Sequence, residues 1–245
     1  MSKVAIITGA SSGIGQALAQ RFNDEGYELV LTYNSNANGI VDTVNRLGVG
    51  AKPFIYKVDM RSEIEISSFV QALKQKYKKI DLLINNAGVG NDAHPLIDQS
   101  YEEISDLMKS NIIGTMYLSQ LIVTAFWGNH EKGCIINTSS IRGLEYAGNP
   151  TSLVYAASKA AMNSFTKTAA KLWAPNVLVN AVAPGFTRVE RIEKFEEKIK
   201  NSFIEQTYLK RLVDVGEIAD AFVFLAKNCA ITGQVIYVDA GFTLK

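Results

Sequence analysis

Short runs of β-branched and aliphatic residues alternate with amphipathic stretches along the whole chain, and this alternation restricts the fold more than any other feature. The runs predict strands at residues 4–8, 28–33, 51–58, 82–85, 134–138, 177–183 and 235–239. The stretches between them predict helices at residues 14–25, 40–47, 64–77, 101–126, 152–173, 190–203 and 215–226. Several strands are apolar on both faces, which is typical of a parallel sheet covered by helices on both sides. We therefore expect one α/β domain over residues 1–245, a doubly wound Rossmann-type parallel sheet of about seven strands.

Composition argues against several classes of function. The 245 residues include 25 Lys and Arg against 24 Asp and Glu, so a formal net charge of +1 offers no general attraction to nucleic acid or to anionic membranes. No stretch approaches the ~18 apolar residues of a membrane helix, and the first apolar run is too short for a signal peptide. The two cysteines and two histidines show no zinc-site spacing. We expect a cytoplasmic protein with reduced thiols and no metal.

The first predicted strand runs directly into a glycine-rich turn at residues 8–15, Thr-Gly-Ala-Ser-Ser-Gly-Ile-Gly, which opens a predicted helix. Glycine permits a tight turn and a close approach of the backbone to a ligand, and the free N–H groups of a helix start favour an anion such as a pyrophosphate. Many strand–helix turns need glycine for geometry alone. The position of this one at the start of a βαβ unit favours a nucleotide site.

Four further residues carry candidate chemistry. Tyr155 and Lys159 lie four positions apart on a predicted helix and share one face, where an ammonium group favours the phenolate and so proton exchange with a carbonyl or alcohol. Taken alone, this pair favours an ordinary amphipathic helix, since Tyr and Lys at this spacing often occur by chance. Ser140 follows a predicted strand, at the edge where ligands of open α/β sheets bind, although a turn or cap serine would look the same. Asn111 lies mid-helix, where its low helix propensity hints at another role.

Six features together resemble the short-chain dehydrogenase/reductase family. They are residues 8–15, residues 85–88 (Asn-Asn-Ala-Gly), Asn111, Ser140, the pair Tyr155 and Lys159, and Pro184 with Gly185. Each is weak alone, but their common order makes chance improbable. The chain most resembles the branch with 3-oxoacyl-(acyl-carrier-protein) reductases and small-molecule alcohol dehydrogenases. The resemblance implies NAD(P)-dependent interconversion of a carbonyl and a secondary alcohol, and usually a homotetramer built partly from the helices that bear Asn111 and Tyr155.

The resemblance also implies roles for individual residues. Tyr155 would be the acid/base, and Lys159 would lower its pKa and hold the nicotinamide ribose. Ser140 would polarise the substrate carbonyl, and Ser139 is a minor rival because only Ser140 fits the family's register. Asn111 would hold a water that links Lys159 to solvent. Cofactor contacts would come from Gly9, Ser11, Ser12, Gly13, Ile14, Gly15, Asn34, Asp59 (at the adenine amine), Asn86, Ala87, Gly88, Tyr155, Lys159, Pro184, Gly185 and Thr187.

The end of the second predicted strand bears on the choice of cofactor. NAD-specific dinucleotide folds usually place an acid there to hold the ribose 2′-OH, whereas this chain continues with Asn34, Ser35 and Asn36. The absence of an acid permits a 2′-phosphate. Ser12, Asn34 and Ser35 could hydrogen-bond it, without the added strength of a charged partner. We expect a modest preference for NADP(H), with NAD(H) also possible.

The substrate site is expected to lie between three segments. These are residues 89–94, a loop at 144–153 that is about two residues longer than usual for the branch, and a substrate lid at about 186–211. In the lid, Ile192, Phe195, Ile199 and Phe203 fall on one face, with Glu190–Lys194 and Glu196–Lys200 as i,i+4 pairs; an ordinary surface helix would show the same pattern. The expected substrate is a small-molecule carbonyl or alcohol.

Two alternatives remain open. The first is a 3-oxoacyl-(acyl-carrier-protein) reductase, which would grip an acidic carrier near residues 129–132 and 173–176, where Lys132 is the one fully charged base. The second is a nucleotide-binding sensor without turnover. Such proteins generally lose the tyrosine or the lysine, and both are present here.

Overall fold

Seven parallel strands form one sheet in the computed structural model, which describes residues 2–90, 96–128, 131–147 and 150–244. The strands are β1 (Val4–Ile7), β2 (Glu28–Tyr33), β3 (Phe54–Lys57), β4 (Leu82–Asn85), β5 (Gly133–Thr138), β6 (Val177–Pro184) and β7 (Val235–Val238). They lie in the order β3-β2-β1-β4-β5-β6-β7, and every neighbouring pair is parallel. The order reverses between β1 and β4, which opens a ligand crevice at the carboxyl ends of these strands. The expected doubly wound fold is confirmed.

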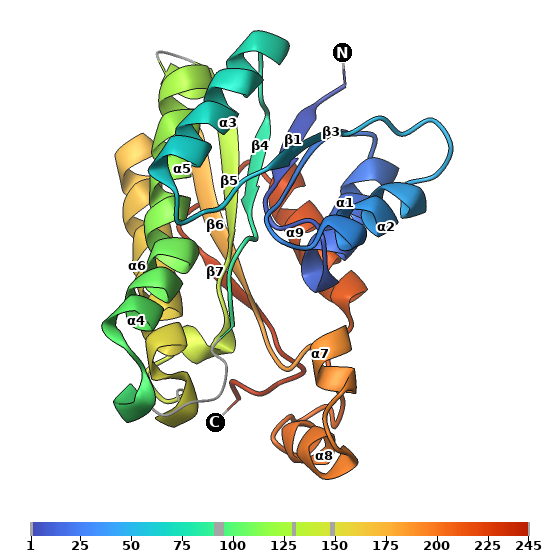
Figure 1. Ribbon diagram of the computed structural model, residues 1–245, viewed down its shortest axis with the longest axis vertical. Helices are drawn as coiled ribbons and strands as arrows, with labels where there is room; N and C mark the ends of the chain where they lie inside the picture. Colours follow the sequence, from blue (N-terminus) through green and yellow to red (C-terminus); the bar gives the residue numbers. More distant parts are fainter. Residues whose placement is uncertain (1, 91–95, 129–130, 148–149, 245) are drawn as a thin grey trace.

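Helices cover both faces of the sheet (Figure 1). Helices α1 (Gly13–Asp24), α2 (Ala37–Arg46) and α9 (Val215–Lys227) pack on one face, and α3 (Glu63–Lys76), α5 (Gly114–Ile122) and α6 (Leu153–Trp173) pack on the other. Successive residues of β1 point to opposite faces, so Ile6 joins the apolar cluster under α3 and α5 while Ile7 joins the cluster under α1 and α9. In the described part of the chain, no helix is both long enough and apolar enough to cross a membrane.

The helix expected over residues 101–126 is one continuous helical run with two π-helical turns. It consists of α4 (Tyr101–Met108), the π turn η2 (Lys109–Ile113), α5 and a second π turn η3 (Val123–Trp127). A π turn inserts an extra residue and often marks a functional position. Asn111 lies in η2 and is 1% exposed. The widened turn, rather than a regular α-helix, therefore carries this side chain into the protein.

The single helix expected over residues 190–203 is wrong. The structure has two short helices, α7 (Glu190–Glu193) and α8 (Glu197–Glu205). The chain turns between them because Phe195 packs into an aromatic cluster, with its ring centroid 6.1 Å from that of Phe203, and this tertiary contact overrides helix propensity. The pair Glu190–Lys194 forms at 2.7 Å, but Lys200 contacts Glu197 and Glu193 instead of Glu196. Ile199 is 40% exposed and does not continue the apolar face.

Short elements complete the fold. Three 3₁₀ turns lie near the carboxyl ends of the strands: η1 (Leu96–Asp98), η5 (Ile141–Gly143) and η6 (Pro150–Ser152). Strand β3 is shorter than the expected residues 51–58, since Pro53 lacks an N–H group and cannot extend the ladder. The lid is anchored at its base, where Val213 N–H donates to the carbonyl of Phe186 and Arg188 N–H donates to the carbonyl of Val213. Both ends of the lid therefore lie beside the end of β6.

Candidate active site

The glycine turn after β1 is packed directly against the loop that follows β4. A Cβ on Gly9, whose φ is +66°, would lie 2.8 Å from the Cα of Ala87, and a Cβ on Gly15 would lie 2.1 Å from the carbonyl oxygen of Gly9. The Asn86 side chain donates to the carbonyls of Thr8 and Gly9 at 3.0 and 3.1 Å. The sequence-predicted residues of the turn and of residues 86–88 thus form one rigid unit.

The start of helix α1 has the properties of a pyrophosphate site. The N-cap residue Ser12 makes no side-chain capping bond, and its carbonyl accepts from the N–H groups of Gly15 and Gln16. Among the described residues, nothing accepts from the N–H groups of Gly13 and Ile14. A helix start with free N–H groups carries partial positive charge and suits a phosphate. The residues present therefore fit a dinucleotide.

Ser140 and Tyr155 come together at the carboxyl end of β5. Ser140 caps η5, where its hydroxyl accepts from the N–H of Arg142 at 3.1 Å, and its side chain is close enough to the Tyr155 phenol to act on the pKa of that group. Burial raises the pKa of Tyr155, while the Ser140 side chain and then the positive charges of Arg191 and Arg142 oppose that rise. Three neighbours therefore stabilise the phenolate form of this tyrosine.

The geometry separates Ser140 from Ser139. The Ser139 hydroxyl donates to the Asn163 side chain at 2.5 Å and lies 3.4 Å from the Lys159 carbonyl. It is held between β5 and α6, where it fixes the position of the helix. Ser140 is the serine beside Tyr155.

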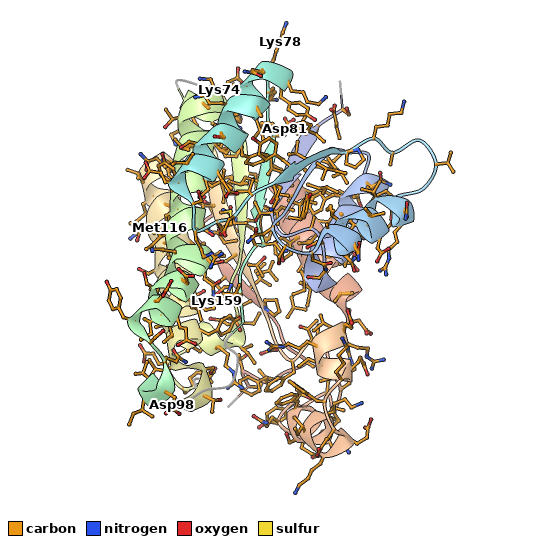
Figure 2. The ribbon with its side chains drawn as sticks, in the orientation of Figure 1. Lys74, Lys78, Asp81, Asp98, Met116 and Lys159 are labelled. Atoms are coloured by element: carbon orange, nitrogen blue, oxygen red, sulfur yellow. The ribbon has the colours of Figure 1, made fainter. Side chains whose placement is uncertain are left out.

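Lys159 is 5% exposed and lies between α6 and the sheet (Figure 2). Its Nζ donates to the carbonyl of Thr138 at 2.8 Å and lies 5.6 Å from the centroid of the Tyr155 ring. Burial lowers the pKa of Lys159 to about 8. The folding of α6 against β5 thus holds a partly desolvated ammonium group beside the candidate acid/base.

Asn111 joins the helical layer to the loop after β4. Its Oδ1 accepts from the N–H of Val89 at 2.8 Å, and its Nδ2 donates to the Val89 carbonyl at 3.0 Å and to the Ser158 hydroxyl at 3.2 Å. A Cβ on Gly88 would lie 3.1 Å from Asn111 Oδ1 and 3.8 Å from Lys159 Nζ. Asn111, Gly88 and Lys159 therefore meet at one point.

The predicted adenosine contacts form a separate group at the ends of β2 and β3. Asp59 forms an ion pair with Arg61 at 2.6 Å, and Arg61 continues to Asp106 on α4, also at 2.6 Å. Bonds from Arg61 and, to a smaller extent, from the Asn34 side chain hold the pKa of Asp59 below its usual range. Ser11 contributes its carbonyl, which accepts from the Asn36 side chain at 3.1 Å and ties α2 to the turn. Arg61 was not among the residues singled out from the sequence as a partner of Asp59.

The remaining predicted residues follow β6. A Cβ on Gly185 would lie 2.6 Å from the Cα of Asp239, so only glycine allows this close crossing with the end of β7. Thr187 is buried and donates its hydroxyl to the Gly185 carbonyl at 3.0 Å. Pro184 ends β6, opposite Val238. All three residues lie at the carboxyl edge of the sheet.

Two arginines near Tyr155 were not singled out from the sequence. Arg142 lies two positions after Ser140, and Arg191 lies on α7 within the lid. Their place in segments already expected to wall the site is the signal that could have found them. Residues 91–94 of one expected wall, 148–149 of another, and residues 129–130, considered for carrier binding, lie outside the described residues.

Comparison with known proteins identifies the family. A family model described as enoyl-(acyl carrier protein) reductase matches residues 9–243. The 3-oxoacyl-(acyl-carrier-protein) reductases of Thermotoga maritima and Staphylococcus epidermidis are 36% and 34% identical to the chain; the alignments span 99% and 98% of it and 98% and 99% of those proteins. The chain belongs to the short-chain dehydrogenase/reductase family. As such, it is an NAD(P)-dependent oxidoreductase that acts on CH–OH and C=O groups.

Solved structures of other short-chain dehydrogenase/reductases superpose on this one over nearly its full length. A member from Brucella melitensis, described as a glucose/ribitol dehydrogenase, has a TM-score of 0.90 at 28% identity, covering 99% of this chain and 97% of its own. A member from Burkholderia xenovorans has a TM-score of 0.87 at 30% identity, covering 100% and 99%. The similarity therefore includes the lid and the last strand.

The buried charge of Lys159 predicts that this residue lowers the stability of the folded protein. Its pKa is about 8 in the folded protein against 10.5 for an exposed lysine, so the ammonium costs on the order of 3 kcal/mol of unfolding free energy at neutral pH. Lys159→Met removes the charge and the bond to Thr138. We expect it to raise the unfolding free energy of the cofactor-free protein by about 1–2 kcal/mol at neutral pH, measured by thermal and urea denaturation.

The pH dependence gives the control. Between pH 8 and 10.5 the unfolded state holds the proton more tightly than the folded state, so wild-type stability gains with rising pH and the advantage of Lys159→Met shrinks. Lys167→Met, at an exposed position of the same helix, should show neither effect. A Lys159→Met protein that melts below wild type at neutral pH would contradict the prediction.

Proposed function

We propose that this protein is an NADP(H)-dependent oxidoreductase that interconverts a carbonyl and a secondary alcohol on a small molecule, with Tyr155 as the acid/base. The observation that carries the proposal is the convergence of the Tyr155 phenol, the Ser140 hydroxyl and the Lys159 ammonium at the carboxyl edge of the sheet. The uncapped start of α1 lies at the same edge. A proton donor and a dinucleotide site therefore share one crevice.

When bound, the nicotinamide cofactor supplies or accepts the hydride. The protein's own residues handle the proton and the substrate oxygen. In the reductive direction the Ser140 hydroxyl donates a hydrogen bond to the substrate carbonyl, and Tyr155 transfers its phenolic proton to the same oxygen. The resulting phenolate is stabilised by Ser140 and by the positive charges of Arg191 and Arg142, the groups that oppose the rise in its pKa.

Lys159 and Asn111 act beside this step. The Lys159 ammonium, fixed on the Thr138 carbonyl, would hold the nicotinamide ribose and assist return of a proton to Tyr155. Asn111 would position a water for that return, and its bonds to Val89 hold the adjoining loop in place. Gly9, Ser11, Ser12, Gly13, Ile14 and Gly15, with Asn86, Ala87 and Gly88, would hold the pyrophosphate and adenosine, and Pro184, Gly185 and Thr187 the nicotinamide.

Removal of one oxygen atom tests the role of Tyr155. We expect Tyr155→Phe to lower kcat by about 10²- to 10⁴-fold, the usual contribution of general acid–base catalysis, with little change in the Kd for cofactor. Steady-state NADPH oxidation and cofactor fluorescence titration give the two quantities. Tyr27→Phe, at the start of β2 and the opposite edge of the sheet, is the matched control and should retain wild-type kinetics. Near-normal kcat in Tyr155→Phe would remove this residue from the mechanism.

A 3-oxoacyl-(acyl-carrier-protein) reductase is the second candidate, because relatives with that name are 36% and 34% identical to the chain. Lys132 is the one fully charged base at residues 129–132 and 173–176, where enzymes of that branch would hold an acidic carrier. A kinetic comparison distinguishes the two candidates. If the protein is a 3-oxoacyl-(acyl-carrier-protein) reductase, a 3-oxoacyl group bound to its carrier protein should react with a much higher kcat/KM than the same acyl group bound to a small amino thiol.

Cofactor preference rests on the end of β2. Asn34 is exposed beside the Asp59–Arg61 pair, and no acid lies among Asn34, Ser35 and Asn36. We expect wild type to prefer NADP(H) modestly, and Asn34→Asp to shift the ratio of kcat/KM toward NAD(H), because a carboxylate repels a 2′-phosphate. Asn201→Asp, which adds the same charge on exposed α8, should leave the ratio unchanged. A wild type that strongly prefers NADH would contradict the proposal.

We also propose a homotetramer that uses the outer faces of α5 and α6. Ile113, the last residue of η2 before α5, is 56% exposed, Met116 on α5 is 45% exposed, and Leu172 on α6 is 71% exposed. Met116 lies on the outer side of the helix layer in Figure 2. Ile113→Glu should shift the mass measured by light scattering to a smaller species, whereas Ile64→Glu, at an exposed position on α3, should not. A monomeric wild type at micromolar concentration would refute the tetramer.

A cytoplasmic location completes the proposal. Both cysteines, Cys134 and Cys229, are free in the structure. Free thiols are typical of reducing compartments.

A further inference from the structure

Arg142 is placed to face a substrate held by Ser140 and Tyr155. It lies on η5, and its N–H is bonded to the Ser140 hydroxyl at 3.1 Å. Its guanidinium is near enough to the Tyr155 phenol for each charge to act on the other. The residue therefore belongs to the wall of the candidate site nearest the reacting oxygen.

The positive charge of Arg142 has no carboxylate partner among the described residues, although the side chain is half-buried. Its contacts are the Ala147 carbonyl, which accepts from Nη1, and the face of Phe186, whose ring centroid lies 5.5 Å from the guanidinium carbon. By contrast, Arg21, Arg61, Arg188 and Arg211 each lie within ion-pair distance of a carboxylate. A partly desolvated charge without a counter-charge is costly, and a bound anion would relieve that cost.

The guanidinium is also held in one orientation. Phe186 stacks on Phe203 of α8 with centroids 4.4 Å apart and an interplanar angle of 12°, and it meets Phe242 edge-on at 5.4 Å. This aromatic cluster fixes the surface on which Arg142 lies, and the Ala147 carbonyl fixes one of its nitrogens. The remaining N–H groups form a planar fork that matches the geometry of a carboxylate.

A second arginine lies close to the same place. Arg191 on α7 acts on Tyr155 as Arg142 does, and its Nη1 would lie 2.7 Å from a Cβ on Gly90. Two guanidinium groups from different walls therefore flank the candidate acid/base. The Arg142 charge, which has no carboxylate partner among the described residues, favours an anionic ligand over a neutral one of similar shape.

We propose that the substrate is an oxo acid, or the corresponding hydroxy acid, whose carboxylate is bound by Arg142 while Ser140 and Tyr155 hold the reacting oxygen. This rests on the function proposed above and specifies its substrate class. The carboxylate is unchanged in the reaction: in the reductive direction the carbonyl carbon gains the hydride from the cofactor and the carbonyl oxygen gains the proton of Tyr155.

Matched acids and esters test the proposal on the full-length protein. With NADPH, short 2-oxo and 3-oxo acids should have at least about tenfold higher kcat/KM than their methyl esters. Arg142→Gln should lower kcat/KM for the acids by about 10²-fold, the range for truncating one side of a buried charge pair. The loss for the esters should be much smaller, because they lose only the effect of the Arg142 charge on Tyr155. Arg142→Lys should restore part of the preference for acids. Arg46→Gln, at an exposed arginine at the end of α2, is the control and should behave as wild type.

A binding measurement keeps this test separate from that of the proposed function. Thermal melting and NADP⁺ titration show whether Arg142→Gln is folded and binds cofactor. Calorimetry of the NADP⁺ complex with the oxo acids, a pair between which no hydride can be transferred, should show binding to wild type that Arg142→Gln loses. If no carbonyl compound is reduced, the proposed function fails, while calorimetry still decides the anion site. Equal kcat/KM for acids and esters in both proteins would overturn the proposal. A preference for phosphorylated ketones over every oxo acid would overturn the assignment to a carboxylate.

Discussion

The contact between the glycine turn and the end of β4 is the constraint on which the rest of the site depends. Thr8 accepts through its hydroxyl from the N–H groups of Asn86 and Ala87, while Asn86 returns two bonds to the turn. With the backbones this close, any side chain at Gly9 or Gly15 would collide with neighbouring atoms. The contact holds together the two strands between which the sheet reverses its order. The crevice at that reversal can therefore keep its shape without a ligand.

A buried chain of polar side chains connects these strands to helix α6, which bears Tyr155 and Lys159. Asn85 on β4 donates to Asn137 on β5 at 2.9 Å and to Ser119 on α5 at 3.0 Å, and Asn137 donates to Thr166 on α6 at 2.9 Å. Asn85 Oδ1 has no hydrogen-bond partner among the described residues, but the bonds that do form in this buried network favour one arrangement of the elements that they join. The position of Tyr155 and Lys159 relative to β5 follows from these bonds and from the Ser139–Asn163 contact.

The sequence predicted the fold well because the alternation of strands and helices is a local pattern that the core then reinforces. The glycine turn and the Tyr155–Lys159 pair were also predictable, since each follows from spacing along one element. Contacts between distant segments were not. Phe195 interrupts the expected helix because it packs into an aromatic cluster formed by residues far apart in the chain. Arg61 forms an ion pair with Asp59, and this contact depends on how the loop after β3 folds. Arg142 was missed for the same reason. What distinguishes it is that the fold places no carboxylate beside it among the described residues, and this cannot be seen from the sequence.

The ion pair between Arg61 and Asp59 makes the electrostatics of the corner proposed for adenosine depend on three segments of the chain. Asp59 follows β3, Arg61 begins the approach to α3, and Asp106 lies on α4. The three side chains carry two negative charges and one positive charge. The electrostatic potential at this corner therefore depends on how the Arg61 guanidinium is shared between Asp59 and Asp106. Loss of Arg61 would leave two carboxylates facing a negatively charged ribose phosphate. Tolerance of the phosphorylated cofactor would then be governed by a side chain that need not touch that cofactor.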